Sequence, residues 1–208
     1  MTFTSIRTSL RGIFNRAVEK PSVSLLHALH ITPNQLTFAG LLIAFVAAYL
    51  LSQGMFWQAA LVFLFSGFVD LLDGSLARST KQATPFGAVF DSVMDRLAEA
   101  AVFLGLLVFY QRAGDQNGVV LCYVAMVTSF MVSYARSRAE GVGTLGAVGF
   151  AGRAERIALL CIPLLINSLE WAQASVLWAL AIISVLSLAT FIQRVYHVWR
   201  TARQPKAT

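Results

Sequence analysis

The chain has 208 residues, of which 57% are hydrophobic and only 12% are charged, and its formal net charge is +6. Soluble domains carry about 25% charged residues, so this composition excludes an ordinary soluble protein. A membrane-spanning helix needs about 20 apolar residues in succession, and such stretches fill most of the sequence. They leave no room for a separate soluble domain, so we expect one all-α integral membrane domain.

The first residues predict a helix that lies on the membrane surface. Between residues 3 and 18, hydrophobic side chains recur on one helical face, while Arg7 and Arg11 lie largely opposite. This pattern is typical of an amphipathic interfacial helix whose basic face meets anionic headgroups. We expect it to end near Pro21, assign residues 1–33 to an amphipathic juxtamembrane segment, and see no cleavable signal peptide.

After the break and cap at Thr32-Pro33-Asn34, hydrophobic stretches predict six membrane-spanning helices. Their ranges are 34–53, 56–78, 87–111, 118–139, 154–168 and 171–199. The fifth is short and contains Pro163, but neighbouring helices can satisfy the backbone group that a proline leaves free. Cys122 and Cys161 fall inside apolar stretches, so we expect buried core thiols rather than a disulfide or a metal pair.

The basic residues predict how these helices are oriented. With six spans, both termini share a side with the connections 79–86 and 140–153. All of the sixteen Lys and Arg residues except Arg112 lie on that side or in the helix ends nearest to it. By the positive-inside rule, the termini and both connections are cytoplasmic, in a multi-pass protein of the cell membrane. The positive charge therefore indicates topology and requires no nucleic acid.

Four acidic residues gather where the second and third predicted spans meet. Asp70 and Asp73 close the second span, and Asp91 and Asp95 open the third. Spacings of three and four residues put each pair on one helical face, and the short connection makes the two helices neighbours. We therefore expect the four carboxylates to meet at one depth. Each ionised group within a span costs at least about 2.5 kcal/mol, which makes these residues functional candidates.

Carboxylates gathered in this way cannot all stay ionised without a cation. Their hard oxygen ligands suit Mg²⁺ or Mn²⁺ better than zinc, and two ions about 4 Å apart are the usual device for phosphoryl displacement. One alternative is structural pairing with Arg78 and Arg96, although two arginines would leave some of the four carboxylates without a partner. Another is a divalent-cation transporter, whose site is expected near the bilayer midplane rather than at one mouth.

Residues beside the acids favour a phosphate ligand. Gly74 and Ala77 have small side chains that let a flat or bulky ligand approach the backbone, and close helix packing is the alternative for these two. Arg78 can form bidentate hydrogen bonds to a phosphate. Together with the carboxylates, these residues indicate a metal-assisted site for phosphate chemistry.

This stretch resembles the signature of the CDP-alcohol phosphotransferase (CDP-alcohol phosphatidyltransferase) family. The signature is Asp, two residues, Asp-Gly, two, Ala-Arg, eight, Gly, three, Asp, three, Asp. The sequence matches every gap, at Asp70, Asp73, Gly74, Ala77, Arg78, Gly87, Asp91 and Asp95. The resemblance implies a six-helix CDP-alcohol phosphotransferase domain over residues 34–200, followed by a basic cytoplasmic tail over 201–208. It also implies a homodimer, the usual state of family members.

The resemblance implies a role for each matched residue. Asp70, Asp73 and Asp91 would bind a first Mg²⁺ or Mn²⁺ ion, and Asp70, Asp91 and Asp95 a second. Asp95 would also be the general base, taking the proton from an acceptor hydroxyl that attacks the lipid-linked β-phosphorus while CMP leaves. The substrate would be CDP-diacylglycerol or a CDP-linked ether lipid. Its cytidine and diphosphate would be held by Pro33, Asn34, Gly74, Ala77, Arg78, Thr84 and Gly87.

A second basic cluster suggests an acceptor alcohol that carries its own phosphate. Its members lie at the cytoplasmic ends of the last three spans: Arg136, Arg138, Arg153, Arg156 and Arg194. Ordinary positive-inside anchoring is the alternative for this cluster. Several arginines that converge beside a metal site suit a small phosphorylated alcohol.

The same segments resemble the phosphatidylinositol-phosphate synthase branch of the family. That branch has Ser-Tyr-x-Lys-Ala-Arg-Ala-Glu, Arg-x-Glu-Arg and Gln-Arg in the last three spans, and an Arg after its fourth Asp, as in Asp95-Arg96. The resemblance implies that Arg136, Arg153 and Arg194 hold the phosphate of inositol 1-phosphate. Arg136 stands where the branch has Lys, which keeps the charge but changes the geometry. Glycerol 3-phosphate, and then serine or an amino alcohol, are the alternative acceptors.

Overall fold

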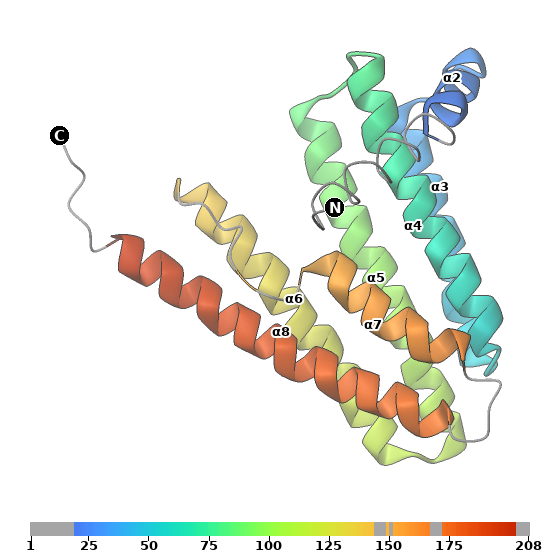
Figure 1. The fold of residues 1–208 in the computed structure, drawn as a ribbon, viewed down its shortest axis with the longest axis vertical. Coiled ribbons are helices and arrows are strands. Elements are labelled where there is room, and N and C mark those ends of the chain that lie inside the picture. The colour runs from blue at the N-terminus through green and yellow to red at the C-terminus, as the bar shows by residue number, and fades with distance from the viewer. Residues whose placement is uncertain (1–18, 144–148, 150–151, 167–171, 203–208) are drawn as a thin grey trace, which may run out of the picture. The chain divides into compact units, whose positions relative to one another are not determined.

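The computed structural model describes residues 19–143, 149, 152–166 and 172–202, and these residues form helices without strands (Figure 1). The helices are α2 (Lys20–Ala28), α3 (Pro33–Ser52), α4 (Phe56–Ser79), α5 (Pro85–Ala113), α6 (Gln116–Gly141), α7 (Arg153–Leu165) and α8 (Ala172–Ala202). The all-α prediction is confirmed for this part of the chain. The interfacial helix expected at residues 3–18 and most of the expected tail lie outside the described residues.

A helix corresponds to each of the six predicted spans, but only four of these helices have the length and composition of a membrane span among the described residues. They are α3, α4, α6 and, from Ala174 to Thr201, α8. Helix α5 is 29 residues long, yet it carries the charged groups of Asp91 and Asp95. Helix α7 has 13 residues, about 20 Å, which is shorter than the roughly 30 Å hydrocarbon core. The structure therefore supports an all-α membrane protein.

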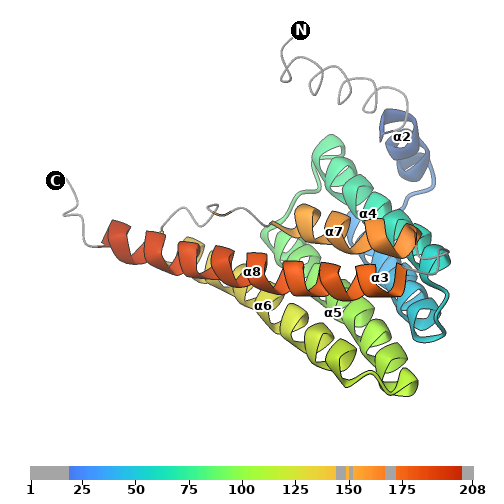
Figure 2. The same ribbon diagram turned by 60° about the horizontal axis from the view of Figure 1, so that its bottom comes forward.

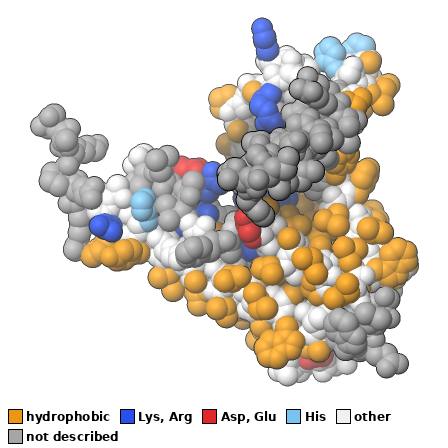
Figure 3. Space-filling view, in the orientation of Figure 1, with side chains coloured by type: hydrophobic (Ala, Val, Ile, Leu, Met, Phe, Trp, Pro, Cys, Tyr) orange, Lys and Arg blue, Asp and Glu red, His pale blue; other side chains and the backbone are white. Residues whose placement is uncertain are grey.

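The outer faces of the helices are hydrophobic. Phe38, Leu71 and Trp178 are 50%, 62% and 70% exposed, respectively. Figure 3 shows hydrophobic side chains over much of the visible surface of the described residues. Soluble monomers rarely expose contiguous apolar surface on this scale, so these side chains are expected to face lipid.

Local sequence determines where helices begin. At the predicted cap before α3, the backbone N–H of Thr32 donates to Gln35 Oε1 (2.9 Å), and the N–H of Gln35 donates to Thr32 Oγ1 (3.4 Å). This reciprocal pair is a capping box, which satisfies two backbone donors that the helix leaves free. Pro33 and Pro85 begin α3 and α5, where a missing N–H costs no helical hydrogen bond.

Helices α3 and α5 are each followed by a glycine in the left-handed conformation. Gly54 has a φ of 75° and Gly114 a φ of 73°. After α3, the N–H of Met55 donates to the carbonyl of Leu50, and the N–H of Gly54 donates to that of Leu51, both at 2.9 Å. This is the Schellman arrangement, which satisfies the last carbonyls of a helix and favours glycine at the left-handed position.

The chain divides into two compact units, and the first contains the acidic stretch. It comprises residues 1–44 and 63–98, so it holds α2, the first half of α3, the second half of α4 and the first half of α5. Its buried cluster is Leu36, Val69 and Leu72, and Val23 and Leu26 of α2 pack against it. Packing therefore fastens α2 to α3 and α4.

Helix α2 was not predicted from the sequence. Pro21, expected near the end of the interfacial helix, lies in the first turn of α2. A proline is tolerated there because the first-turn N–H groups have no partner within the helix. Farther along this unit, Ser66 Oγ donates to the carbonyl of Gly40 (2.8 Å) in a buried hydrogen bond between α4 and α3.

The second unit comprises residues 45–62 and 99–208, and α8 is its central element among the described residues. Helix α8 packs along α6 and also against α7 (Figure 2). Leu180 and Ile183 of α8 are fully buried. Cys122 and Cys161 are buried and free, as predicted. The packed centre of this unit is thus mainly apolar.

Candidate active site

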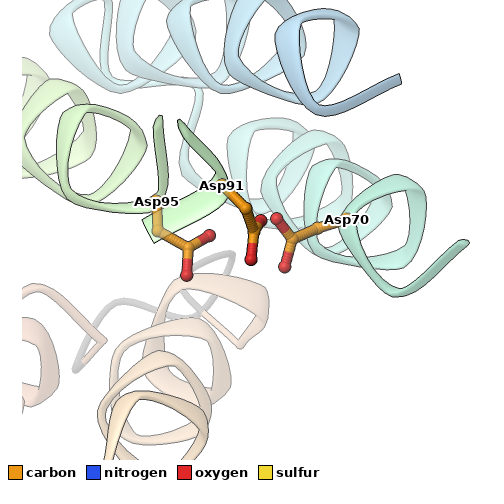
Figure 4. Close-up of side chains that lie close together, drawn as sticks. All are labelled: Asp70, Asp91 and Asp95. Carbon is orange, nitrogen blue, oxygen red and sulfur yellow. The ribbon is translucent and has the colours of Figure 1, made fainter. Parts of the chain in front are cut away.

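Three of the four predicted metal-binding carboxylates converge in the first unit. Asp70 extends from α4, and Asp91 and Asp95 extend from α5 (Figure 4). One carboxylate oxygen of each lies within 4.8 Å of the others, and all three side chains are half-buried. The convergence follows from the sequence, because Asp91 and Asp95 are one helical turn apart and only residues 80–84 join α4 to α5.

This donor set fits a hard divalent cation. Three carboxylates this close repel one another strongly unless positive charge lies among them. Oxygen-only ligands suit Mg²⁺ and Mn²⁺ rather than metals that prefer sulfur or nitrogen. Among the described residues, Asp70, Asp91 and Asp95 are the group of acidic, His or Cys side chains whose geometry suits a metal ion.

Asp73, the fourth predicted metal ligand, is engaged differently. Its side chain is 5% exposed, and its Oδ2 accepts a hydrogen bond from Thr37 Oγ1 of α3 at 2.5 Å. The bond ties α4 to α3 beside the predicted Pro33-Asn34 turn. Sequence reasoning missed Thr37, whose only signal is that it lies one helical turn after Pro33.

A pocket of about 210 Å³ adjoins these carboxylates, and all seven residues predicted to hold the CDP group line it. Asp73 and Asp91 also line it, so the pocket and the carboxylate group share Asp91. The seven predicted lining residues come from three helices and one connection: Pro33, Asn34, Gly74, Ala77, Arg78, Thr84 and Gly87. The residues that the family resemblance implies for the CDP group thus line one cavity.

Small side chains give this pocket its shape. Thr84 Oγ1 accepts the backbone N–H of Gly87 (3.0 Å) and so caps α5. A Cβ on Gly87 would lie 3.1 Å from Thr84 Oγ1 and 3.5 Å from Asn34 Oδ1. A Cβ on Gly74 would lie 3.3 Å from Nη1 of Arg78. Glycine at both positions therefore leaves room for polar groups that a phosphate or a base could contact.

The predicted acceptor arginines all lie in the second unit, in different surroundings. Arg136 is exposed and pairs with Glu140 of the same helix at 2.8 Å, and Arg138 is also exposed. Arg153 is half-buried at the start of α7. Arg194 is 7% exposed, and its Nη1 donates to the carbonyl of Val132 at 2.7 Å. The described contacts thus join α8 to α6 through Arg194.

Arg156 differs from the others because it is paired inside the protein. Its Nε donates to Glu99 Oε1 (3.0 Å) and its Nη2 to Glu99 Oε2 (3.2 Å). The two side chains are 3% and 5% exposed. A guanidinium committed to a buried bidentate pair is poorly placed to receive a substrate phosphate. We therefore assign Arg156 a structural role and leave it out of the acceptor set.

Breaking this buried pair should destabilise the protein. Glu99→Ala leaves a buried guanidinium without its carboxylate, so we expect a loss of about 3–5 kcal/mol in unfolding free energy. Glu140→Ala is the matched control: it removes the carboxylate of an exposed pair and should cost less than about 0.5 kcal/mol. Thermal and denaturant unfolding in detergent measure both. Equal losses from the two variants would contradict the structural role of Glu99.

Comparison with known proteins points to the same family as the sequence motif and the geometry of the site. Residues 30–194 match the family model described as CDP-alcohol phosphatidyltransferase. The chain is 38% identical to archaetidylinositol phosphate synthase of Pyrococcus horikoshii over 176 residues, 82% of this chain and 85% of that protein. It is 34% identical to phosphatidylinositol phosphate synthase of Mycobacterium tuberculosis over 198 residues, 91% of this chain and 88% of that protein.

Solved structures resemble the fold as well. The crystal structure of the Mycobacterium tuberculosis phosphatidylinositol phosphate synthase with CDP-DAG bound matches with a TM-score of 0.84 at 29% identity, covering 92% of this chain and 99% of that one. The same enzyme in complex with manganese and citrate matches with a TM-score of 0.82, covering 91% and 94%. The sequence match, the shared fold and the pocket agree: the chain belongs to the CDP-alcohol phosphatidyltransferase family.

Proposed function

We propose that this protein transfers a phosphatidyl group from CDP-diacylglycerol, or its counterpart from a CDP-linked ether lipid, to inositol 1-phosphate and releases CMP. One observation carries the proposal: Asp91 belongs both to the carboxylate group and to the pocket lined by the predicted CDP-binding residues. Relatives named as phosphatidylinositol phosphate and archaetidylinositol phosphate synthases support the acceptor. A related structure with CDP-DAG bound supports the donor.

The carboxylates would hold two Mg²⁺ or Mn²⁺ ions, with Asp70, Asp73 and Asp91 at one and Asp70, Asp91 and Asp95 at the other. Bound ions would neutralise the diphosphate and the charge that develops on the leaving phosphate. The carboxylate geometry and the manganese complex of a related structure support metal binding. Asp73 would take part while keeping its bond to Thr37, because a carboxylate has two oxygens and several lone pairs.

The pocket residues would bind and orient the CDP group. Gly74, Ala77 and Gly87 leave the backbone open to the nucleotide, and Asn34 and Thr84 offer polar atoms beside Gly87. Arg78 would form charge-assisted hydrogen bonds to the diphosphate. These contacts hold the lipid-linked β-phosphorus still, which is how positioning lowers the barrier of a phosphoryl transfer.

Asp95 would be the general base. Its carboxylate takes the proton of the acceptor hydroxyl, and the hydroxyl oxygen forms a bond to the β-phosphorus. The bond from that phosphorus to the bridging oxygen breaks, and CMP leaves with the electron pair. Arg136, Arg153 and Arg194, with Arg138 nearby in sequence, would bind the phosphate of the acceptor; their charge and their match to the synthase motifs support this role.

The protein would work as a multi-pass homodimer of the cell membrane. We propose six spans over residues 34–200, including α5 and α7, with an interfacial helix before them and a basic tail after them. Both termini and the active site would be cytoplasmic. The distribution of Lys and Arg supports this orientation, as does Arg112, which donates to the carbonyl of Ser52 (3.3 Å) at the opposite helix ends.

A panel of acceptors tests the function. Purified protein with CDP-diacylglycerol and Mg²⁺ should release CMP fastest with inositol 1-phosphate. Glycerol 3-phosphate, serine, inositol and no acceptor complete the panel. Faster CMP release with glycerol 3-phosphate or serine would mean that the protein catalyses the same reaction with that compound as the acceptor. Absence of CMP release with every acceptor would reject the enzymatic proposal for this chain.

Arg153→Ala tests the acceptor site within the same assay. We expect the KM for inositol 1-phosphate to rise by about tenfold or more, since a charged hydrogen bond contributes about 1.5–3 kcal/mol. The KM for CDP-diacylglycerol should change little. Equal increases in both KM values would remove Arg153 from the acceptor pocket.

A further inference from the structure

We infer that Glu19 and Ser75 are positioning residues that hold Arg78 ready for the diphosphate of the CDP-linked substrate. The inference rests on the proposed function, in which Arg78 contacts that diphosphate. Neither Glu19 nor Ser75 is among the eight signature residues, and Glu19 lies in a segment far from them in sequence. Both residues belong to the first unit, as Arg78 does.

A chain of side-chain hydrogen bonds connects the three residues. Arg78 Nη2 donates to Ser75 Oγ at 3.0 Å, and Ser75 Oγ in turn donates to Glu19 Oε1. Ser75 thereby uses its hydroxyl once as acceptor and once as donor, which a serine can do without conflict. A carboxylate at the end of such a chain polarises the hydroxyl and makes it a better acceptor for the guanidinium.

The side chain of Glu19 joins this series of hydrogen bonds rather than capping its own helix. It stands at the N-cap of α2, yet its side chain makes no capping hydrogen bond there. Short side chains such as Ser, Thr, Asp and Asn are the usual caps, so glutamate at this place offers α2 little by itself. Its carboxylate instead reaches Ser75 of α4, 56 residues away in sequence.

Arg78 lines two cavities. One is the pocket of about 210 Å³ lined by the predicted CDP-binding residues; the other is a cavity of about 560 Å³ whose lining includes Glu19, Ser75 and Arg78. The side chain folds back over Gly74, since a Cβ there would lie 3.3 Å from Nη1 of Arg78. Ser75 and Glu19 therefore restrain an otherwise solvent-exposed arginine at the edge of the pocket.

Restraining Arg78 before the substrate arrives should strengthen binding of the CDP group. A long arginine side chain loses rotational freedom when it binds a phosphate, and a preformed orientation removes part of that loss. We expect Ser75→Ala and Glu19→Ala each to raise the KM and the dissociation constant for CDP-diacylglycerol about fivefold to tenfold. The kcat and the KM for the acceptor should change by less than about twofold, and Glu19→Gln, which keeps an acceptor oxygen, should recover most of the affinity.

Two comparisons separate positioning from a purely structural role. Ser79→Ala removes a hydroxyl that lines the same cavity but donates to the carbonyl of Leu76 (3.0 Å), so CDP-diacylglycerol binding should stay unchanged. In an Arg78→Ala background, adding Glu19→Ala should not weaken binding further, because the group that Glu19 positions is absent. A further loss of affinity in that double variant would overturn the inference.

The outcomes distinguish this inference from the proposed function. If wild-type protein releases no CMP with any acceptor in the panel, the proposed function fails. If wild type is active while Ser75→Ala and Glu19→Ala keep the wild-type affinity for CDP-diacylglycerol, the positioning role alone fails. It also fails if both variants lower kcat and thermal stability without changing that affinity. A selective rise in KM with partial recovery in Glu19→Gln supports it.

Discussion

Asp95→Asn is expected to lower CMP release from CDP-diacylglycerol by about 10²–10⁴-fold while the protein remains folded. Asparagine has nearly the same shape as aspartate, so the helix and its packing are kept, but its amide cannot take the acceptor proton. Loss of a well-placed general base produces rate effects of this size. Asp95 lies on α5 with its carboxylate beside those of Asp91 and Asp70, where the lost charge also weakens cation binding. CMP release under saturating substrates measures the effect.

Asp115→Asn is the matched control for this substitution. Asp115 caps α6, where its Oδ1 accepts the backbone N–H of Gly118 at 3.1 Å. Asparagine caps helices about as well as aspartate, so stability and turnover should both stay near wild type. Near-normal turnover of Asp95→Asn, with normal folding, would remove Asp95 from the role of base.

Much of the fold was predictable because helices that cross a bilayer require long apolar stretches, which are easy to recognise in a sequence. Long apolar stretches separated by turn and cap residues marked six helices, and α3 to α8 were found at those places within a few residues. Helix α2 was missed because it has only nine residues. A helix this short is not stable by itself and depends on tertiary contacts, here those of Val23 and Leu26 with the cluster of Leu36, Val69 and Leu72.

The candidate site was predictable wherever helical spacing alone decides which side chains share a face. Asp91 and Asp95 are four residues apart and point the same way, so they meet Asp70 as expected. Asp70 and Asp73 are three apart, which turns the second side chain by about 60° around α4. In that direction Asp73 accepts a hydrogen bond from Thr37 of α3, and Thr37 has no distinctive sequence signal.

Contacts between segments far apart in the sequence could not be predicted from the sequence. Five arginines near the predicted cytoplasmic ends looked alike in sequence, yet Arg156 forms a buried pair with Glu99 and Arg194 donates to a backbone carbonyl. Burial and partner choice depend on how the helices pack, which no local pattern encodes. The same holds for Glu19, whose bond to Ser75 joins segments 56 residues apart.

Asp91→Asn is expected to remove most of the divalent-cation binding of the protein, even without substrate. Asp91 is the carboxylate that lies both in the group of three and at the wall of the pocket lined by the predicted CDP-binding residues. Removal of an outer-shell partner alone costs about 10–100-fold in metal affinity, so loss of a direct ligand should cost at least as much. Mn²⁺ titration followed by electron paramagnetic resonance measures the affinity and should give two ions per wild-type chain. CMP release should disappear in Asp91→Asn and in chelator-treated wild type.

Either of two results would overturn the proposal that this protein is a metal-dependent transferase. Asp91→Asn that binds Mn²⁺ with wild-type affinity would mean that the three carboxylates are not a metal site, whatever their distance. Metal flux through wild-type protein in liposomes without CDP-lipid would indicate a cation transporter instead of a transferase. Asp115→Asn, which removes a charge from a helix cap, should bind Mn²⁺ as wild type does. Restoration of CMP release to the chelated wild type by Mg²⁺ or Mn²⁺, but not to Asp91→Asn, is the expected pattern if Asp91 is a ligand of both ions, as proposed.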